Sequence, residues 1–235
     1  MSGWKITVFP KYGKKIFIVT EGPSEEHFAK AILAPHFLDY DKNIIPITIL
    51  TKRDNRHGIM YKGGMSSYSK MQNSLEPVLK RASKSEDSYV STMVDFYALP
   101  TDTPGYANAM KYSDAYDKVR QLENSILQKV GHERHFKPYI QLHEFEALLF
   151  ADIEQLSTEY FDCQIDELRQ AISAQPNPEL INNSFETAPS KRILKAIPAY
   201  DKTVAGIEVL RRIGLNKIRD KCRHFNDWIT HLEQI

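Results

Sequence analysis

Apolar and polar stretches alternate along the first 151 residues in a way that predicts strands and helices in turn. The run KIFIVT at 15–20 is short and apolar and stops before Glu21-Gly22, which is typical of a buried strand. Further strands are predicted at 44–50, 89–96 and 138–142, and helices at 24–37 (with Ser24 as N-cap), 67–82, 113–130 and 146–151. This alternation favours an α/β fold, a mainly parallel sheet flanked by helices.

The pattern changes after Ala151. From there the periodicity predicts only helices interrupted by prolines, at 166–173, 190–197, 204–212 and 226–232. Residues 51–65 and 177–188 are polar and are expected to form loops. We therefore expect an α/β domain over 1–151 and a helical C-terminal extension over 152–235 that packs on it.

Composition narrows the class of protein. Of the 235 residues, 42% are hydrophobic and 26% charged, which is usual for a globular protein. No apolar run reaches the roughly 20 residues of a membrane span, and Met1 to Lys15 lack a signal core, so we expect a cytoplasmic protein with no membrane partner. Cys163 and Cys222 are too few for a disulfide framework and form no zinc-binding pair. The net charge of +1 neither requires nor excludes nucleic acid.

Carboxylates follow the ends of three predicted strands. Glu21 and Glu25 follow the first, Asp95 ends the third, and Glu144 and Glu146 follow the fourth. Because the carboxyl ends of parallel strands meet at one edge of a sheet, these groups are expected to converge there. Converging carboxylates favour a hard cation such as Mg²⁺ or Mn²⁺. The expected chemistry is phosphoryl transfer or phosphodiester hydrolysis.

The segment His143-Glu144-Phe145-Glu146 allows two arrangements. In an extended segment both glutamates point to the same side and both could bind metal. In a helical segment they diverge by about 200°, so that one of them serves. We favour Glu144 as the site residue. His143 is expected to be a hydrogen-bonded structural histidine.

Basic residues gather in two other segments. Lys191 and Arg192 lie at a predicted helix start, where backbone N–H groups favour phosphate, and Lys202 is close in sequence. Arg53, Arg56 and Lys62 lie in the polar stretch before the second helix. Together they could grip the backbone of DNA or RNA beside the acidic site. The alternative is that they are solvated surface residues.

Several motifs carry a resemblance to a known family. The segment IFIVTEG at 16–22, with Glu25, resembles the first motif of Toprim domains, and Asp95 matches the first aspartate of their Asp-x-Asp motif, whereas Tyr97 stands at the second. The whole chain resembles a family of small Toprim-like prokaryotic proteins of unassigned function. Its hallmarks are VTEGPSEE (19–26), DFYALP (95–100), HEFEALL (143–149), PSKR (189–192) and Phe225-x-x-Trp228.

The resemblance implies a Mg²⁺-dependent nuclease, often beside an ATPase in phage defence. It implies Glu21 as general base or acid or as a metal ligand, with Asp95 and Glu144 holding the ion and Glu25 and Glu146 assisting. Lys191 and Arg192 would neutralise phosphate. The missing aspartate keeps a second hypothesis open, a non-catalytic regulatory subunit that docks an ATPase and senses phosphate or nucleic acid. A third is a phosphatase or nucleotidyl transferase acting on a small substrate.

Overall fold

The computed structural model describes residues 13–54, 59–62, 65–97, 99–132, 134–161, 164–181 and 187–235. For residues 51–54 and 59–62 it describes the backbone alone. Arg56 and Cys163 therefore lie outside the described residues, as do the side chains of Arg53 and Lys62.

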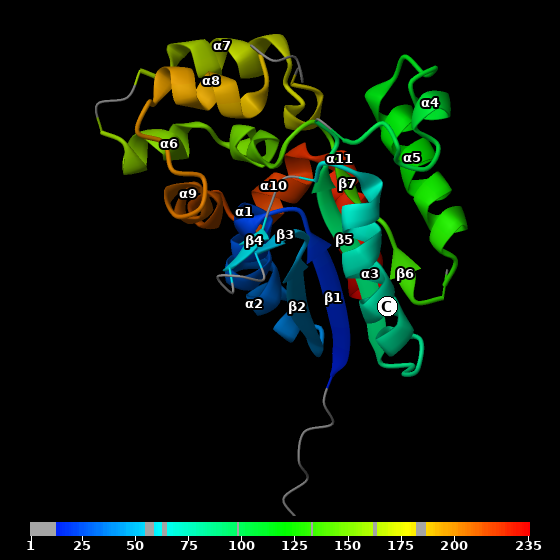
Figure 1. The fold of residues 1–235 in the computed structure, drawn as a ribbon. Helices are drawn as coiled ribbons and strands as arrows, with labels where there is room; N and C mark the ends of the chain where they lie inside the picture. Colours follow the sequence, from blue (N-terminus) through cyan, green and yellow to red (C-terminus); the bar gives the residue numbers. More distant parts are fainter. Residues whose placement is uncertain are drawn as a thin grey trace, which may run out of the picture.

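A parallel sheet forms the centre of the fold (Figure 1). Its strands are β1 (Lys14–Thr20), β2 (Lys42–Thr48), β5 (Ser88–Asp95), β6 (Phe136–Lys137) and β7 (Ile140–Gln141). The order is β2-β1-β5-β6, with β7 also pairing with β5, and every pair in this sheet is parallel. The carboxyl ends of β1, β5 and β7 therefore share one edge, which confirms the predicted parallel sheet.

Helices cover both faces of the sheet because its strands are apolar on both sides. Along β1, Ile16 and Ile18 belong to one core, and Phe17 and Val19 belong to the other. The first core is covered by α1 (Pro23–Phe28), η1 (Ala29–Leu33), α2 (Ala34–Leu38) and α11 (Arg223–Gln234). The second is covered by α3 (Tyr68–Ala82) and α5 (Ala115–Val130).

The C-terminal part is helical, as predicted, and shares a core with the sheet. It contains α6 (Glu154–Glu159), α7 (Asp166–Ala174), η3 (Pro178–Leu180), α8 (Pro189–Ala196), α9 (Ala205–Ile213), α10 (Leu215–Lys221) and α11. Ile193, Ile207 and Trp228 belong to the same hydrophobic cluster as Ile16 and Ile18. Helices α6 to α8 lie beyond the carboxyl-terminal edge of the sheet (Figure 1). In the described part of the chain, no helix has the length and apolar character needed to cross a membrane.

The structure corrects several predicted elements. The stretch 51–65, expected as a loop, contains most of an antiparallel strand pair, β3 (Leu50–Asp54) with β4 (Ile59–Lys62). The polar and basic residues of this stretch favoured a loop in the sequence and hid its strand-forming residues. Of the predicted strand 138–142 only β7 (Ile140–Gln141) is a strand, and it is separated from β6 by Pro138, which has no N–H for a ladder. The predicted helix 146–151 is a 3₁₀ helix, η2 (Phe145–Ala151), and a short helix α4 (Tyr106–Ala109) was not predicted.

Candidate functional site

Glu21 connects the ends of two neighbouring strands. It directly follows β1, and its backbone N–H donates to the carbonyl of Met93 in β5 at 3.1 Å. Its carboxylate accepts a hydrogen bond from the N–H of Asp95 at 3.1 Å and a longer one from the N–H of Met65 at 3.5 Å. The side chain of Glu21 is therefore held across the carboxyl end of β5.

Glu25 is turned back toward the end of β1 by the start of helix α1. Gly22 is the N-cap and Pro23 the first helical residue, which replaces the expected cap at Ser24. Glu25 is the third helical residue, and its Oε2 accepts from the N–H of Gly22 at 2.8 Å. A carboxylate here completes a capping interaction and is favoured by the helix dipole. Glu25 is nevertheless buried, with 5% of its surface exposed.

Asp95 is the last residue of β5 and carries an unpaired acceptor. Its Oδ1 is buried and has no hydrogen-bond partner among the described residues. An unpaired buried acceptor costs about 1–3 kcal/mol, and more when it is charged. This oxygen is therefore placed to accept a proton, a water molecule or a cation.

Glu144 and Glu146 contact different groups, and the segment matches neither the fully extended nor the fully helical alternative. Glu146 lies in η2 and is buried, with its Oε1 3.8 Å from Nζ of Lys202. Glu144 precedes η2 in extended conformation. Its carboxylate accepts from the N–H of Ser190 at 2.9 Å and from the Ser190 hydroxyl at 3.1 Å. The carboxylate of Glu144 is thus held at the start of α8, and its charge still acts on Glu146 and Lys202.

The pKa values show that four carboxylates and one lysine share a single electrostatic environment. We call Glu21, Glu25, Asp95 and Glu146 the acidic cluster. Burial raises the pKa of each of them. Repulsion by Glu21 and Glu146 adds to the effect of burial on Glu25, whose pKa reaches about 7. Burial alone would lower the pKa of Lys202, but the attraction of Glu146 and its neighbours raises it.

The donor set of the acidic cluster fits a hard divalent cation. All of its donors are carboxylate oxygens, like charges are crowded together, and Oδ1 of Asp95 is orphaned. Within the described ranges, however, no three His, Cys, Asp or Glu side chains already stand at the spacing that would hold a metal ion. Ion binding would therefore require these carboxylates to turn toward one another.

The predicted phosphate-binding residues are dispersed. Lys202 lies at the acidic cluster. Arg192 donates from Nε to the carbonyl of Thr187 at 2.7 Å and lines a cavity beside α7. Lys191 is in α8 and also interacts with a neighbour. The side chains of Arg53 and Lys62 are outside the described residues.

Two further buried polar side chains, Tyr200 and His143, have an atom without a hydrogen-bond partner in the described chain. Tyr200 has a buried hydroxyl without a hydrogen-bond partner in the described chain; burial and then Glu146 raise its pKa. Nδ1 of His143 is likewise buried and unpartnered, so the expectation of a hydrogen-bonded histidine is wrong for this nitrogen. Burial and then Lys118 lower the pKa of His143 to about 4. No local pattern marks Tyr200, because its environment comes from distant segments.

The fold and the site together define a class, an α/β protein with carboxylates gathered at the carboxyl edge of a parallel sheet. The chain belongs to the family described as "Domain of unknown function (DUF4276)", whose model matches residues 20–233. The acidic cluster and Lys202 lie inside the matched region.

Solved structures that are similar to this chain include two of the C-terminal region of the Xanthomonas campestris pv. campestris OLD protein. The one phased with platinum is 13% identical, covers 95% of this chain and 97% of its own, and has a TM-score of 0.40. The one phased with mercury is 12% identical, covers 96% of this chain and 100% of its own, and also has a TM-score of 0.40. No curated protein matches the chain.

Proposed function

We propose that this protein is a Mg²⁺- or Mn²⁺-dependent nuclease of the Toprim type that hydrolyses phosphodiester bonds in DNA or RNA. The observation that carries the proposal is the acidic cluster, in which Oδ1 of Asp95 is buried without a partner in the described chain. Burying several carboxylates together is costly, and a divalent ion that meets phosphate offsets this cost.

Glu21, Asp95 and Glu146 would hold the ion, with Glu25 beside them. Glu144 would join them after leaving Ser190. When bound, the ion would polarise a phosphoryl oxygen and lower the pKa of a water molecule. The crowded carboxylates support this assignment because burial, and then mutual repulsion, raise the pKa of Asp95 and of Glu25 when no cation is present.

Side chains of the protein would supply positive charge to the phosphate and would transfer protons. Lys202 lies next to Glu146 and would balance negative charge on a phosphate that enters the site. Glu21 would act as general base or as a metal ligand. Glu25, with a pKa of about 7, could accept or release a proton near neutral pH. Lys191, Arg192, Arg53 and Lys62 would contact the nucleic-acid backbone farther from the reacting phosphate.

The biological setting follows from the Toprim resemblance. We infer a cytoplasmic protein that acts in anti-phage defence with an ATPase partner. The proposed division is a Toprim-like domain over 1–151 and a helical extension over 152–235. The shared core and the Glu144–Ser190 contact support a close attachment of the two parts.

One observation favours a second function. Tyr97 stands at the second aspartate of the Toprim motif, and no three potential ligands in the described residues stand at ion-binding spacing. A regulatory subunit that docks an ATPase and senses nucleic acid or phosphate would need neither the second aspartate nor a preformed set of metal ligands. In that case the acidic cluster would titrate without catalysing hydrolysis.

A cleavage assay distinguishes the two functions. Purified protein is incubated with single- and double-stranded DNA and RNA in Mg²⁺ or Mn²⁺, with EDTA as the blank. The proposal predicts metal-dependent cleavage that Glu21→Gln abolishes and that the surface control Glu86→Gln retains. Equal cleavage by Glu21→Gln would reject the assigned site. If no substrate is cleaved with or without a candidate ATPase, the regulatory function is favoured.

A further inference from the structure

A second candidate site lies at the β6 edge of the sheet, away from the acidic cluster. It is a cavity of about 490 Å³ between α5, α11 and the edge segment Lys137–Tyr139. This volume is in the range of small-molecule sites, roughly 300–1,000 Å³. None of the residues that line the cavity belongs to the acidic cluster.

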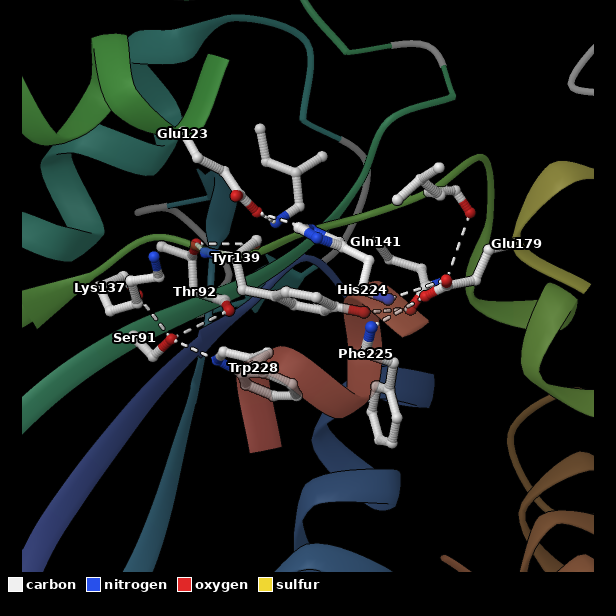
Figure 2. A network of polar contacts seen from close by, with 12 residues as sticks. Ser91, Thr92, Glu123, Lys137, Tyr139, Gln141, Glu179, His224, Phe225 and Trp228 are labelled. Carbon is white, nitrogen blue, oxygen red and sulfur yellow. Dashed lines mark hydrogen bonds and ion pairs between the residues drawn. The ribbon is translucent and has the colours of Figure 1, made fainter. Parts of the chain in front are cut away.

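Three aromatic rings form a stack along one wall of this cavity. The ring of Tyr139 lies 4.2 Å from that of Trp228 at an interplanar angle of 8°, and 5.1 Å from that of His224 at 21°. Figure 2 shows Tyr139 between the other two rings, so His224 ends the stack. All three residues line the cavity. The ring of Tyr116 lies 6.5 Å from that of His224 at 69°, so a planar ligand would meet the exposed part of His224 beside Tyr116.

Hydrogen bonds hold the stack in place (Figure 2). The indole N–H of Trp228 donates to Oγ of Ser91 at 2.8 Å, and the hydroxyl of Tyr139 donates to Gln141 at 2.6 Å. Nε2 of His224 lies 3.0 Å from Oε1 of Glu123. The rings are thus oriented before any ligand arrives, which reduces the entropy lost on binding.

Basic and acidic side chains both border the same cavity. Lys137 on the sheet edge and Arg223 on α11 line it, and neither has an ion-pair partner in the part of the chain that the structure describes. Oε1 of the buried Glu123 accepts from the N–H of Ile140 at 2.8 Å and also contacts His224. Asp114 and Asp227 also line the cavity and could accept hydrogen bonds from a ligand.

We propose that this cavity binds a nucleotide, with the base stacked on His224 and the phosphate held by Lys137 and Arg223. A ring stack next to two unpaired cations matches a ligand that combines a planar base with an anion. The carboxylates of Asp114 and Asp227 suit the amino or hydroxyl groups of a nucleoside. The ligand is either a free nucleotide or one nucleotide of a nucleic-acid strand. This site does not depend on hydrolysis at the acidic cluster.

Calorimetric titration tests the proposal. The full chain in EDTA is titrated with AMP, GMP, CMP and UMP, and separately with single-stranded DNA and RNA oligonucleotides. We expect saturable binding of at least one of these probes. The double variant Lys137→Ala/Arg223→Ala should bind at least about tenfold more weakly. The matched control Lys84→Ala/Arg134→Ala, which changes surface residues outside the cavity, should bind like the wild type.

The outcomes distinguish a free nucleotide from a nucleic-acid strand, and binding in the cavity from binding at the acidic cluster. Binding of mononucleotides indicates a free nucleotide, and binding of oligonucleotides alone indicates a strand. Unchanged affinity in Lys137→Ala/Arg223→Ala overturns the proposal, provided that its circular dichroism and melting match the wild type. Absence of binding by every probe at about 5 mM overturns it as well. Binding that Asp95→Asn removes, while the double variant keeps it, places the ligand at the acidic cluster instead.

Discussion

The carboxylate of Glu21 accepts a hydrogen bond from the backbone N–H of Asp95 at 3.1 Å, although 74 positions separate the two residues. The contact exists because β1 and β5 are parallel neighbours, with Thr20 opposite Met93. It holds one carboxylate beside another that has an unpaired oxygen. Coulombic repulsion between the two groups raises the pKa of Asp95 further, after the larger effect of burial.

The first prediction concerns Asp95→Asn. The amide is nearly isosteric and cannot ionise, so it removes the repulsion that an ionised Asp95 would add to the acidic cluster. We expect the free energy of unfolding in EDTA to rise by about 1 kcal/mol, because repulsion is relieved. Metal-dependent cleavage should fall by at least about 100-fold, because a proposed ion ligand is replaced. Chemical denaturation and the cleavage assay measure the two effects.

Asp117→Asn is the control for this variant, because Asp117 is partly exposed and pairs with Arg120 on the surface. Asp117→Asn should change neither the free energy of unfolding nor the rate of cleavage appreciably. A destabilised Asp95→Asn protein that still cleaves would contradict both halves of the prediction.

The second prediction concerns pH. Burial, followed by repulsion from Glu21 and Glu146, raises the pKa of Glu25 from 4.5 to about 7. Because the folded state binds the proton more tightly than the unfolded chain, the stabilisation is complete below about pH 4.5 and is lost as the pH rises through 7. The shift corresponds to a change on the order of 3 kcal/mol. Metal-free protein should therefore be less stable at pH 8 than at pH 5.

Glu25→Gln tests this assignment in EDTA by urea denaturation across that pH range. Its amide oxygen can still accept from the N–H of Gly22, so the capping interaction is conserved. We expect a shallower pH dependence and greater stability than the wild type at pH 8. The exposed control Glu86→Gln should follow the wild-type curve, and a Glu25→Gln curve that does the same would remove Glu25 as the cause.

The third prediction concerns the contact between Glu144 and Ser190. Glu144→Ala leaves the N–H and the hydroxyl of Ser190 without their acceptor at the start of α8. The expected loss is about 1–3 kcal/mol of unfolding free energy. Ser190→Ala removes only one of the two hydrogen bonds and should cost less. Thermal melting measures both, and equal stability of Glu144→Ala and the wild type would show that the contact contributes little.

The fourth prediction concerns Glu179, which is buried and caps helix α11. Its carboxylate accepts from the N–H of His224 at 2.9 Å and from the N–H of Phe225 at 2.8 Å (Figure 2). Glu179→Ala should destabilise the protein by about 2–3 kcal/mol, since two helix N–H groups lose a charged acceptor. Glu167→Ala on the surface of α7 is the comparison, and urea denaturation of both variants should separate them clearly.

Much of the fold could be predicted because local patterns encode it. The apolar run before Glu21 and the β-branched run before Asp95 place both residues at strand ends. The choice between Glu144 and Glu146 could not be predicted, because it depends on where the chain changes from extended to 3₁₀ conformation. The role of Ser190 and the stack of Tyr139 on Trp228 depend on contacts between distant segments, which periodicity does not encode.

The central claim is that the acidic cluster holds one divalent ion. Calorimetric titration of the metal-free protein with Mn²⁺ tests it most directly, without any need for a substrate. One saturable binding event is expected in the wild type and in Glu86→Gln, and its loss is expected in Asp95→Asn. Absence of binding at millimolar Mn²⁺, or the same isotherm for wild type and Asp95→Asn, would contradict it.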